Sequence, residues 1–181
     1  MSERLPTDEL RAEHDVALGQ INELVEAAAG VRNRESRAWE EVGRGLRERV
    51  EELGGALLLH FRKEEEGLFT DVVAMVSKDA PRVDILAHFF EEEADDDLKA
   101  HTLLRGRLKE LTALLDKAEK ARKLEAEEAA RFDLLANLAR DLLERHAKKE
   151  HELVFPMIER LLDDEQMRAA WTRIREISGS A

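Results

Sequence analysis

Apolar residues recur at every third or fourth position along most of this 181-residue chain, which is the spacing of amphipathic helices. The series predicts four long helices and a short last one, near residues 8–30, 36–76, 84–115, 125–162 and 165–177. Four long helices joined by short connections are typical of an up-down-up-down bundle. We therefore expect an all-α fold, with a single domain over residues 1–181 whose four-helix bundle spans about residues 8–162.

Three glycines and one proline interrupt the predicted helices. Gly54, Gly55 and Gly67 lie within the second helix, and glycine weakens a helix relative to alanine. Pro156 lies near the end of the fourth helix and has no backbone amide to donate. We expect a kink or a break at these positions.

The composition restricts the classes of function. Charged residues make up 39% of the chain and aromatic residues 4%, which is typical of long solvated helices. The net charge of −12 argues against nucleic-acid binding, which requires a basic surface, and against docking on an anionic membrane. The absence of cysteine excludes disulfides, thiolate metal sites and cysteine nucleophiles. No signal-peptide pattern and no stretch of about 18 apolar residues occurs, so we expect a cytoplasmic protein.

A histidine-containing motif occurs twice. The segment HFRKEEEGLF, which begins at His60, returns 86 residues later as HAKKEHELVF, which begins at His146. Another histidine precedes each copy, His14 by 46 residues and His101 by 45 residues. A step of this length runs out along one helix and back along the next, so both histidines return to a similar height. We interpret the chain as two matching helical hairpins.

Each copy of the motif places a glutamate four residues after its histidine, at Glu64 and Glu150. Residues four apart lie on one face of a helix, with their Cβ atoms about 5–6 Å apart, so the imidazole and the carboxylate point to a common place. His14 and His101 bring the set to six donors. Imidazole suits iron, and a carboxylate can bridge two cations and partly neutralise them. The set therefore predicts a site for two first-row metal ions.

Other interpretations of these histidines are weaker. Pairs of histidine and glutamate arise by chance on the surface of a Glu-rich chain, but chance does not explain the duplication. His88 also has a glutamate four residues later, yet it lies 13 residues before His101, about 20 Å along one helix, and the repeat register favours His101. Ferritin-type di-iron sites use Glu-x-x-His, which this chain lacks.

The order His, HxxxE, His, HxxxE, with Lys-Glu inside each HxxxE and Leu-Phe or Val-Phe-Pro after it, resembles the hemerythrin-like (HHE cation-binding) family from about Leu10 to Leu162. The resemblance implies a four-helix bundle around a non-haem centre of two iron ions with an oxo or hydroxo bridge, and zinc or manganese are the alternative metals. Carried over by position, the resemblance assigns four histidine ligands and two bridging carboxylates: His14, His60, His101, His146, Glu64 and Glu150.

Two positions depart from the oxygen-carrying members of that family. The carriers have a histidine four residues before the third-helix ligand, where this chain has Asp97. They have an aspartate five residues after the fourth-helix histidine, where this chain has His151. The chain is therefore more similar to the bacterial sensor-like branch, whose metals keep more open positions. We expect Asp97 to be an additional ligand or an acceptor for one. His151, about 100° around the helix from Glu150, is expected to support a ligand or to face solvent, with direct ligation as the alternative.

Two functions of different classes follow from the resemblance. The first is a binding protein or sensor for oxygen, nitric oxide or a related small oxidant, which would need a separate protein partner as its output. The alternative is a di-iron enzyme or iron-handling protein that reduces peroxide or nitric oxide, or donates iron for repair. Repair proteins of the related branch usually carry an N-terminal cysteine pair, which this chain lacks. A structural bundle with a zinc-filled site is a third interpretation.

Overall fold

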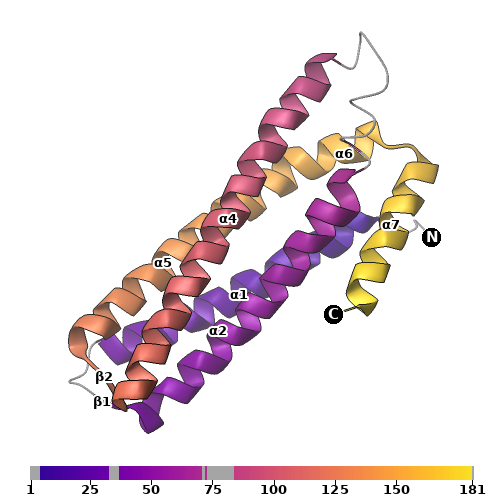
Figure 1. Cartoon of the computed structure of the whole chain (residues 1–181). Helices are drawn as coiled ribbons and strands as arrows, with labels where there is room; N and C mark the ends of the chain where they lie inside the picture. The colour runs from indigo at the N-terminus through magenta and orange to yellow at the C-terminus, as the bar shows by residue number, and fades with distance from the viewer. Residues whose placement is uncertain (1–4, 33–36, 71, 73–83, 181) are drawn as a thin grey trace. The chain divides into compact units, whose positions relative to one another are not determined.

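The computed structural model describes residues 5–32, 37–70, 72 and 84–180, and their side chains except those of 37–41 and 84–95. The described residues form long helices, two short π-helical turns and one pair of two-residue strands, so the predicted all-α class is confirmed. In chain order (Figure 1) these elements are α1 (Pro6–Arg32), β1 (Arg37–Ala38), α2 (Trp39–Arg62), η1 (Lys63–Leu68), α4 (Asp84–Ala121), β2 (Lys123–Leu124), α5 (Ala126–Lys149), η2 (Glu150–Val154), α6 (Phe155–Leu161) and α7 (Asp164–Gly179).

The two π-helical turns follow the two copies of the histidine motif. In a π-helical turn a backbone amide bonds the carbonyl five residues before it, instead of four. The amide of Phe69 bonds the Glu64 carbonyl at the end of η1, and the amide of Phe155 bonds the Glu150 carbonyl at the end of η2. The irregularities expected at Gly67 and Pro156 are therefore widened turns at the predicted metal carboxylates.

Other predicted boundaries differ in detail from the structure. Gly54 and Gly55 lie within the uninterrupted α2, so the helix does not break there. The third long helix extends to Ala121, and the chain then turns at Arg122, whose φ of 52° is in the left-handed region. The predicted end of the second helix, near residue 76, lies outside the described residues.

The chain divides into two compact units, and the four long helices contribute a segment to each. The first unit consists of Met1–His14, Leu58–His101 and His146–Ala181, and the second of Asp15–Leu57 and Thr102–Arg145. All of the residues predicted to form or support the metal site belong to the first unit. The site can therefore be described within a single unit.

The second unit is held together by apolar packing and by ion pairs between its helices. Its fully buried side chains come from α1, α2, α4 and α5 and include Leu24, Leu53, Leu111 and Phe132. Arg32 of α1 donates a hydrogen bond of 2.7 Å to Asp133 of α5. The strands β1 and β2 pair antiparallel, with Arg37 opposite Leu124. The sequence pattern did not predict this short strand pair.

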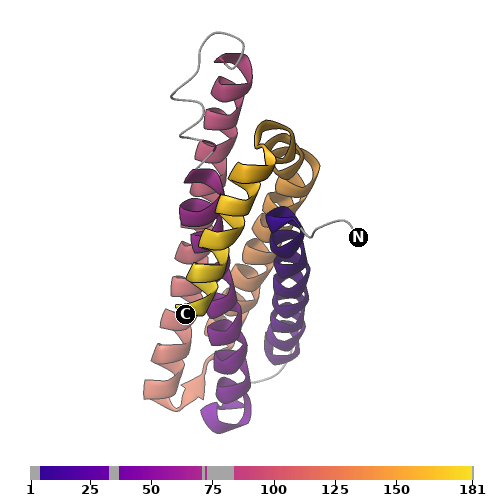
Figure 2. The same cartoon turned by 90° about the vertical axis from the view of Figure 1, so that its right-hand side faces the viewer.

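The first unit has an apolar cluster that joins its helix segments. The buried members of this cluster are Leu10, Leu68, Phe69, Val72, Val154, Phe155, Ile158, Leu162, Met167, Ala170 and Ile174. Helix α7 contributes the last three of them and contacts η1 directly. Figures 1 and 2 both show α7 beside η1, at the end of α2. Within the described ranges, no helix combines the length and the hydropathy that crossing a bilayer requires.

Helix α7 begins with a capping box, which gives a first testable prediction. The Asp163 carboxylate accepts hydrogen bonds of 2.9 Å from the amides of Glu165 and Gln166, and the Gln166 side chain accepts one of 2.8 Å from the Asp163 amide. We expect Asp163→Ala to lower the free energy of unfolding by about 1 kcal/mol, because two amides lose their acceptor. Urea denaturation of this variant beside Asp164→Ala, which removes a neighbouring charge and leaves the cap, measures the effect. Equal losses in both variants would contradict it.

Candidate metal centre

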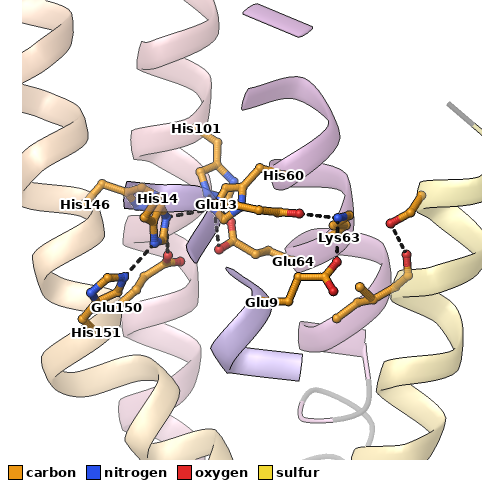
Figure 3. A network of polar contacts seen from close by, with 12 residues as sticks. Glu9, Glu13, His14, His60, Lys63, Glu64, His101, His146, Glu150 and His151 are labelled. Atoms are coloured by element: carbon orange, nitrogen blue, oxygen red, sulfur yellow. Dashed lines mark hydrogen bonds and ion pairs between the residues drawn. The ribbon is translucent and has the colours of Figure 1, made fainter. Parts of the chain in front are cut away.

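Six side chains from four helix segments of the first unit meet at one buried place. His60 and His146 are 3% exposed and the other four members are fully buried. The set is the one predicted from the repeat: His14 of α1, His60 of α2, Glu64 of η1, His101 of α4, His146 of α5 and Glu150 of η2. Figure 3 shows the imidazoles and carboxylates turned toward one another. We refer to these six residues as the inner cluster.

The inner cluster is built from Nε2 atoms and carboxylate oxygens. Nε2 of His14 lies 2.8 Å from Nε2 of His60. The two oxygens of Glu64 divide between two imidazoles: Oε1 is 3.0 Å from Nε2 of His60, and Oε2 is 3.2 Å from Nε2 of His101. Oε2 of Glu150 is 3.2 Å from Nε2 of His14 and 3.5 Å from Nε2 of His146.

Most of these inner atoms lack a hydrogen bond. Among the described residues, both oxygens of Glu64, both oxygens of Glu150, and Nε2 of His101 and of His146 have no hydrogen-bond partner. Leaving a buried polar atom unpaired costs about 1–3 kcal/mol, so a cluster of such atoms needs a compensating ligand. Donor atoms of five members of the cluster lie within 4.8 Å of one another. Lone pairs from imidazole and carboxylate at this spacing fit metal cations.

The outer nitrogens of the imidazoles face polar groups at the edge of the cluster. Nδ1 of His60 is 3.0 Å from Oε2 of Glu13, and Nδ1 of His101 is 2.8 Å from Oε1 of Glu65. An ionised carboxylate only accepts hydrogen bonds, so in both contacts Nδ1 carries the proton, and Nε2 is the nitrogen whose lone pair would be available to a bound metal ion. Neither Glu13 nor Glu65 was predicted. The local signal for Glu65 is only its position directly after Glu64, which in a regular helix would place it on a different face.

Two lysines hold the outer acceptors in place. Nζ of Lys63 donates to Glu9 at 2.9 Å and makes a short bond to Glu13, the partner of His60. Nζ of Lys149 lies 3.3 Å from Oδ1 of Asp97. Lys63 and Lys149 each stand three residues after a motif histidine, so the lysine that recurs in register contacts a carboxylate beside its own histidine in both copies. Only Glu13 is within hydrogen-bond distance of its histidine, since Oδ1 of Asp97 is 3.8 Å from Nδ1 of His146.

Asp97 and His151 lie on the outer side of the inner cluster. Oδ1 of Asp97 is 3.8 Å from Nδ1 of His146, on the opposite edge of that imidazole from Glu150. Nε2 of His151 is 3.0 Å from Nδ1 of His14. Both side chains thus face an outer nitrogen instead of the inner cluster. The side chain of His88 lies outside the described residues.

The comparisons with known proteins agree with this geometry. The family model described as the hemerythrin HHE cation binding domain matches residues 5–158. The chain belongs to the hemerythrin HHE family. The resemblance inferred from the sequence is therefore confirmed, and the buried histidine and glutamate cluster of this family member fits a metal-binding protein. A search of the curated proteins found no match.

The π-helical turns bring two consecutive residues of this hemerythrin-like chain to the site. A turn closed by a bond to the fifth residue holds about one residue more than an α-helical turn of 3.6 residues. As a result, the fifth residue after each motif histidine lies close to the helix face that carries the fourth residue. Glu64 and Glu65 both reach His101, and His151 reaches His14 while Glu150 stays in the inner cluster.

Two phenylalanine rings cover imidazoles of the site. The ring of Phe61 stacks on His101, with centroids 4.0 Å apart and planes at 19°. The ring of Phe155 stacks on His14 at 6.0 Å, also at 19°. Both phenylalanines are fully buried. By excluding water they lower the local dielectric and strengthen each electrostatic interaction inside the site.

The electrostatics of the inner cluster are unbalanced without a cation. Burial raises the pKa of Glu150 well above its usual value, and the charges of Glu64 and Asp97 raise it further. Burial acts in the same direction on Glu64, but the charges of His60 and His146, together with the contacts that His60 and His101 make with this carboxyl, outweigh burial and lower its pKa. Burial opposes the charged form of His60, yet Glu64 and Glu13 together raise its pKa to about 9. Burial and the charge of His60 lower the pKa of His14 to about 2. One histidine alone cannot stabilise two buried carboxylates.

Proposed function

We propose that this protein holds two iron ions in the inner cluster and binds or senses oxygen, nitric oxide or a related small oxidant. Four imidazole Nε2 atoms and two carboxylates converge in a buried site, most of them without a hydrogen-bond partner among the described residues, and this observation carries the proposal. The residues that would hold the metal ions are His14, His60, His101, His146, Glu64 and Glu150.

The arrangement of the donors supports two metal positions. His14 and His60 form one pair, with their Nε2 atoms 2.8 Å apart, and the rings of His101 and His146, with centroids 4.9 Å apart, form another. Glu64 contacts one imidazole of each pair, as does Glu150. A carboxylate in that position is suited to bridge two cations and to offset their mutual repulsion. A mixture of imidazole and carboxylate suits iron, and zinc or manganese are the alternatives.

The chemistry supplied by two bound iron ions would be reversible binding of a small oxidant and exchange of electrons with it. The protein's own residues prepare the place for that chemistry. Glu13 and Glu65 orient His60 and His101 and make their Nε2 atoms stronger donors. Phe61 and Phe155 keep water away from the imidazoles that they cover.

An optical titration tests the proposed ligand. We expect the protein loaded with Fe(II) under anaerobic conditions to change its absorption spectrum when oxygen or nitric oxide is added, and to recover when the gas is removed. The His146→Ala variant, which removes one imidazole of the second pair, should lose the reversible change. An unaltered spectrum with oxygen, nitric oxide and peroxide would refute the binding function.

The alternative function is that of a di-iron redox enzyme or an iron-handling protein. Asp97 favours it, because this aspartate faces the outer nitrogen of His146 and adds no donor to the inner cluster. Six donors shared between two metals leave positions open for a substrate. Turnover of peroxide or nitric oxide faster than by the same concentration of free iron would support the enzyme over the binding protein. A cytoplasmic location and a separate protein partner remain predictions.

A further inference from the structure

Helix α7 makes hydrogen bonds and apolar contacts with η1, the π-helical turn that carries Glu64 and Glu65. Nε and Nη2 of Arg173 donate hydrogen bonds of 3.1 and 3.0 Å to the carbonyl oxygen of Gly67, within η1. The neighbouring Ile174 is fully buried against the same residue. A Cβ atom added at Gly67 would lie 2.8 Å from Cγ1 of Ile174, closer than real contacts allow. Glycine therefore permits this close approach of α7.

The second copy of the motif forms its π-helical turn by a different means. At the repeat offset of 86 residues, Pro156 is the counterpart of Thr70, and Leu153 is the counterpart of Gly67. Pro156 has no amide, so a regular α-helical bond cannot form at that position and η2 is favoured by the chain itself. Thr70 has an amide, so the local sequence at η1 does not impose the wider turn.

In η1, which has no proline directly after it, side chains donate hydrogen bonds to the backbone carbonyls of the turn. The hydroxyl of Thr70 donates a bond of 2.9 Å to the carbonyl of Glu66. Arg173 donates its two bonds to the carbonyl of Gly67, the next residue. Backbone carbonyls must find donors, and a turn that departs from the α-helical pattern has to obtain them from elsewhere. Arg173 provides them from a helix that lies 106 residues further along the chain.

We propose that Arg173 is a positioning residue, which holds η1 in its π-helical form and thereby places Glu64 and Glu65 against His101. The part of this inference that concerns metal affinity rests on the proposed function. Helix α7 begins at Asp164, beyond the segment 5–158 that matches the family. Arg173 and its contact with η1 therefore come from a part of the chain outside the segment that matches the family.

The hydrogen bond between His101 and Glu65 tests the proposal in the metal-free protein. In Arg173→Ala, η1 relaxes toward an α-helix and Glu65 turns away, so the imidazole Nδ1 proton of His101 should lose its slow exchange with water in nitrogen-correlated NMR spectra. Glu65→Ala, which removes the acceptor, identifies the signal. Arg168→Ala, an exposed arginine on the same helix, is the matched control and should keep the signal. Arg173→Lys, which retains one donor, should restore part of it.

Metal titration provides the second measurement. We expect Arg173→Ala to bind Zn(II) about 10-fold more weakly than the parent, the scale of the loss when a partner behind a metal ligand is removed, and Arg168→Ala to bind as the parent does. Gly67→Ala, which forces α7 away through Ile174, should reproduce both effects if Arg173→Ala does not fold.

Two results separate this inference from the proposed function. A folded Arg173→Ala variant whose His101 proton is protected as in the parent would overturn the positioning role, whatever its metal affinity. Failure of the parent to bind Zn(II) or Fe(II) would instead overturn the metal site, and the proton signal of His101 would still decide whether Arg173 holds η1.

Discussion

The His60→Ala variant is expected to hold less than one iron ion per chain, whereas we expect the parent protein loaded with Fe(II) to hold two. His60 has two of the short inner contacts, since its Nε2 lies 2.8 Å from Nε2 of His14 and 3.0 Å from Oε1 of Glu64. Its removal takes one imidazole from a metal position and also leaves a buried carboxylate without its nearest cation. Loss of a direct ligand should exceed the 10- to 100-fold effect typical of partners behind the ligands. Metal analysis after gel filtration measures the content.

The matched control for this prediction is His88→Ala. His88 also precedes a glutamate by four residues, so it shares the sequence feature of the predicted ligands, but the register of the repeat assigns the third-helix position to His101. We expect it to keep two ions per chain. A chelator should lower the melting temperature of the parent and of His88→Ala and leave that of His60→Ala almost unchanged, because bound metal stabilises only a protein that binds it. Equal metal contents in the two variants would contradict the assignment.

The Glu150→Gln variant is expected to stabilise the metal-free protein while it removes metal binding. Both oxygens of Glu150 are fully buried and have no hydrogen-bond partner among the described residues, and the carboxyl shares its surroundings with Glu64 and Asp97. Glutamine has nearly the same shape and carries no charge, so the cost of an unpaired buried charge is relieved. We expect a gain of about 1–3 kcal/mol in the free energy of unfolding without metal.

Urea denaturation in the presence of a chelator, followed by metal titration, measures both sides of this prediction. Glu152→Gln provides the control, because this exposed glutamate lies in the same π-helical turn and loses the same charge. Its stability should change by less than about 0.5 kcal/mol and its metal content should stay that of the parent. A Glu150→Gln protein that is less stable than the parent without metal would show that the carboxylate is already compensated.

The repeat in the sequence was a good guide to the inner cluster because it reports on helix faces. Histidine and glutamate four residues apart lie on one face in any helix, and the matched intervals place the four histidines at one height. The structure brings these six side chains together, fully buried or nearly so. The divergent positions of the repeat also have physical reasons. Gly67 leaves room for the close approach of Ile174 to η1. Pro156 lacks a backbone amide and therefore favours the π-helical form of η2.

Asp97 and His151 were expected beside the cluster, but the contacts made by the surrounding residues could not be predicted in the same way. A regular helix turns 100° per residue and would point Glu65 and His151 away from the imidazoles that they contact. The π-helical turns reverse this expectation, and one of them receives its donors from Arg173, far along the chain. Glu13 acts on His60 through a contact between two helices, which no periodicity within one helix reports.

The sequence by itself determined the all-α class, the long helices, the family and the six histidines and glutamates that meet in the inner cluster, because each of these depends on local periodicity or on the order of a few residue types. Only the tertiary structure decided which nitrogen of each histidine faces inward, how Lys63 and Lys149 hold the outer acceptors, and that α7 supports η1. Those features depend on hydrogen bonds between helices that are far apart in the sequence, and their geometry exists only after the helices have packed.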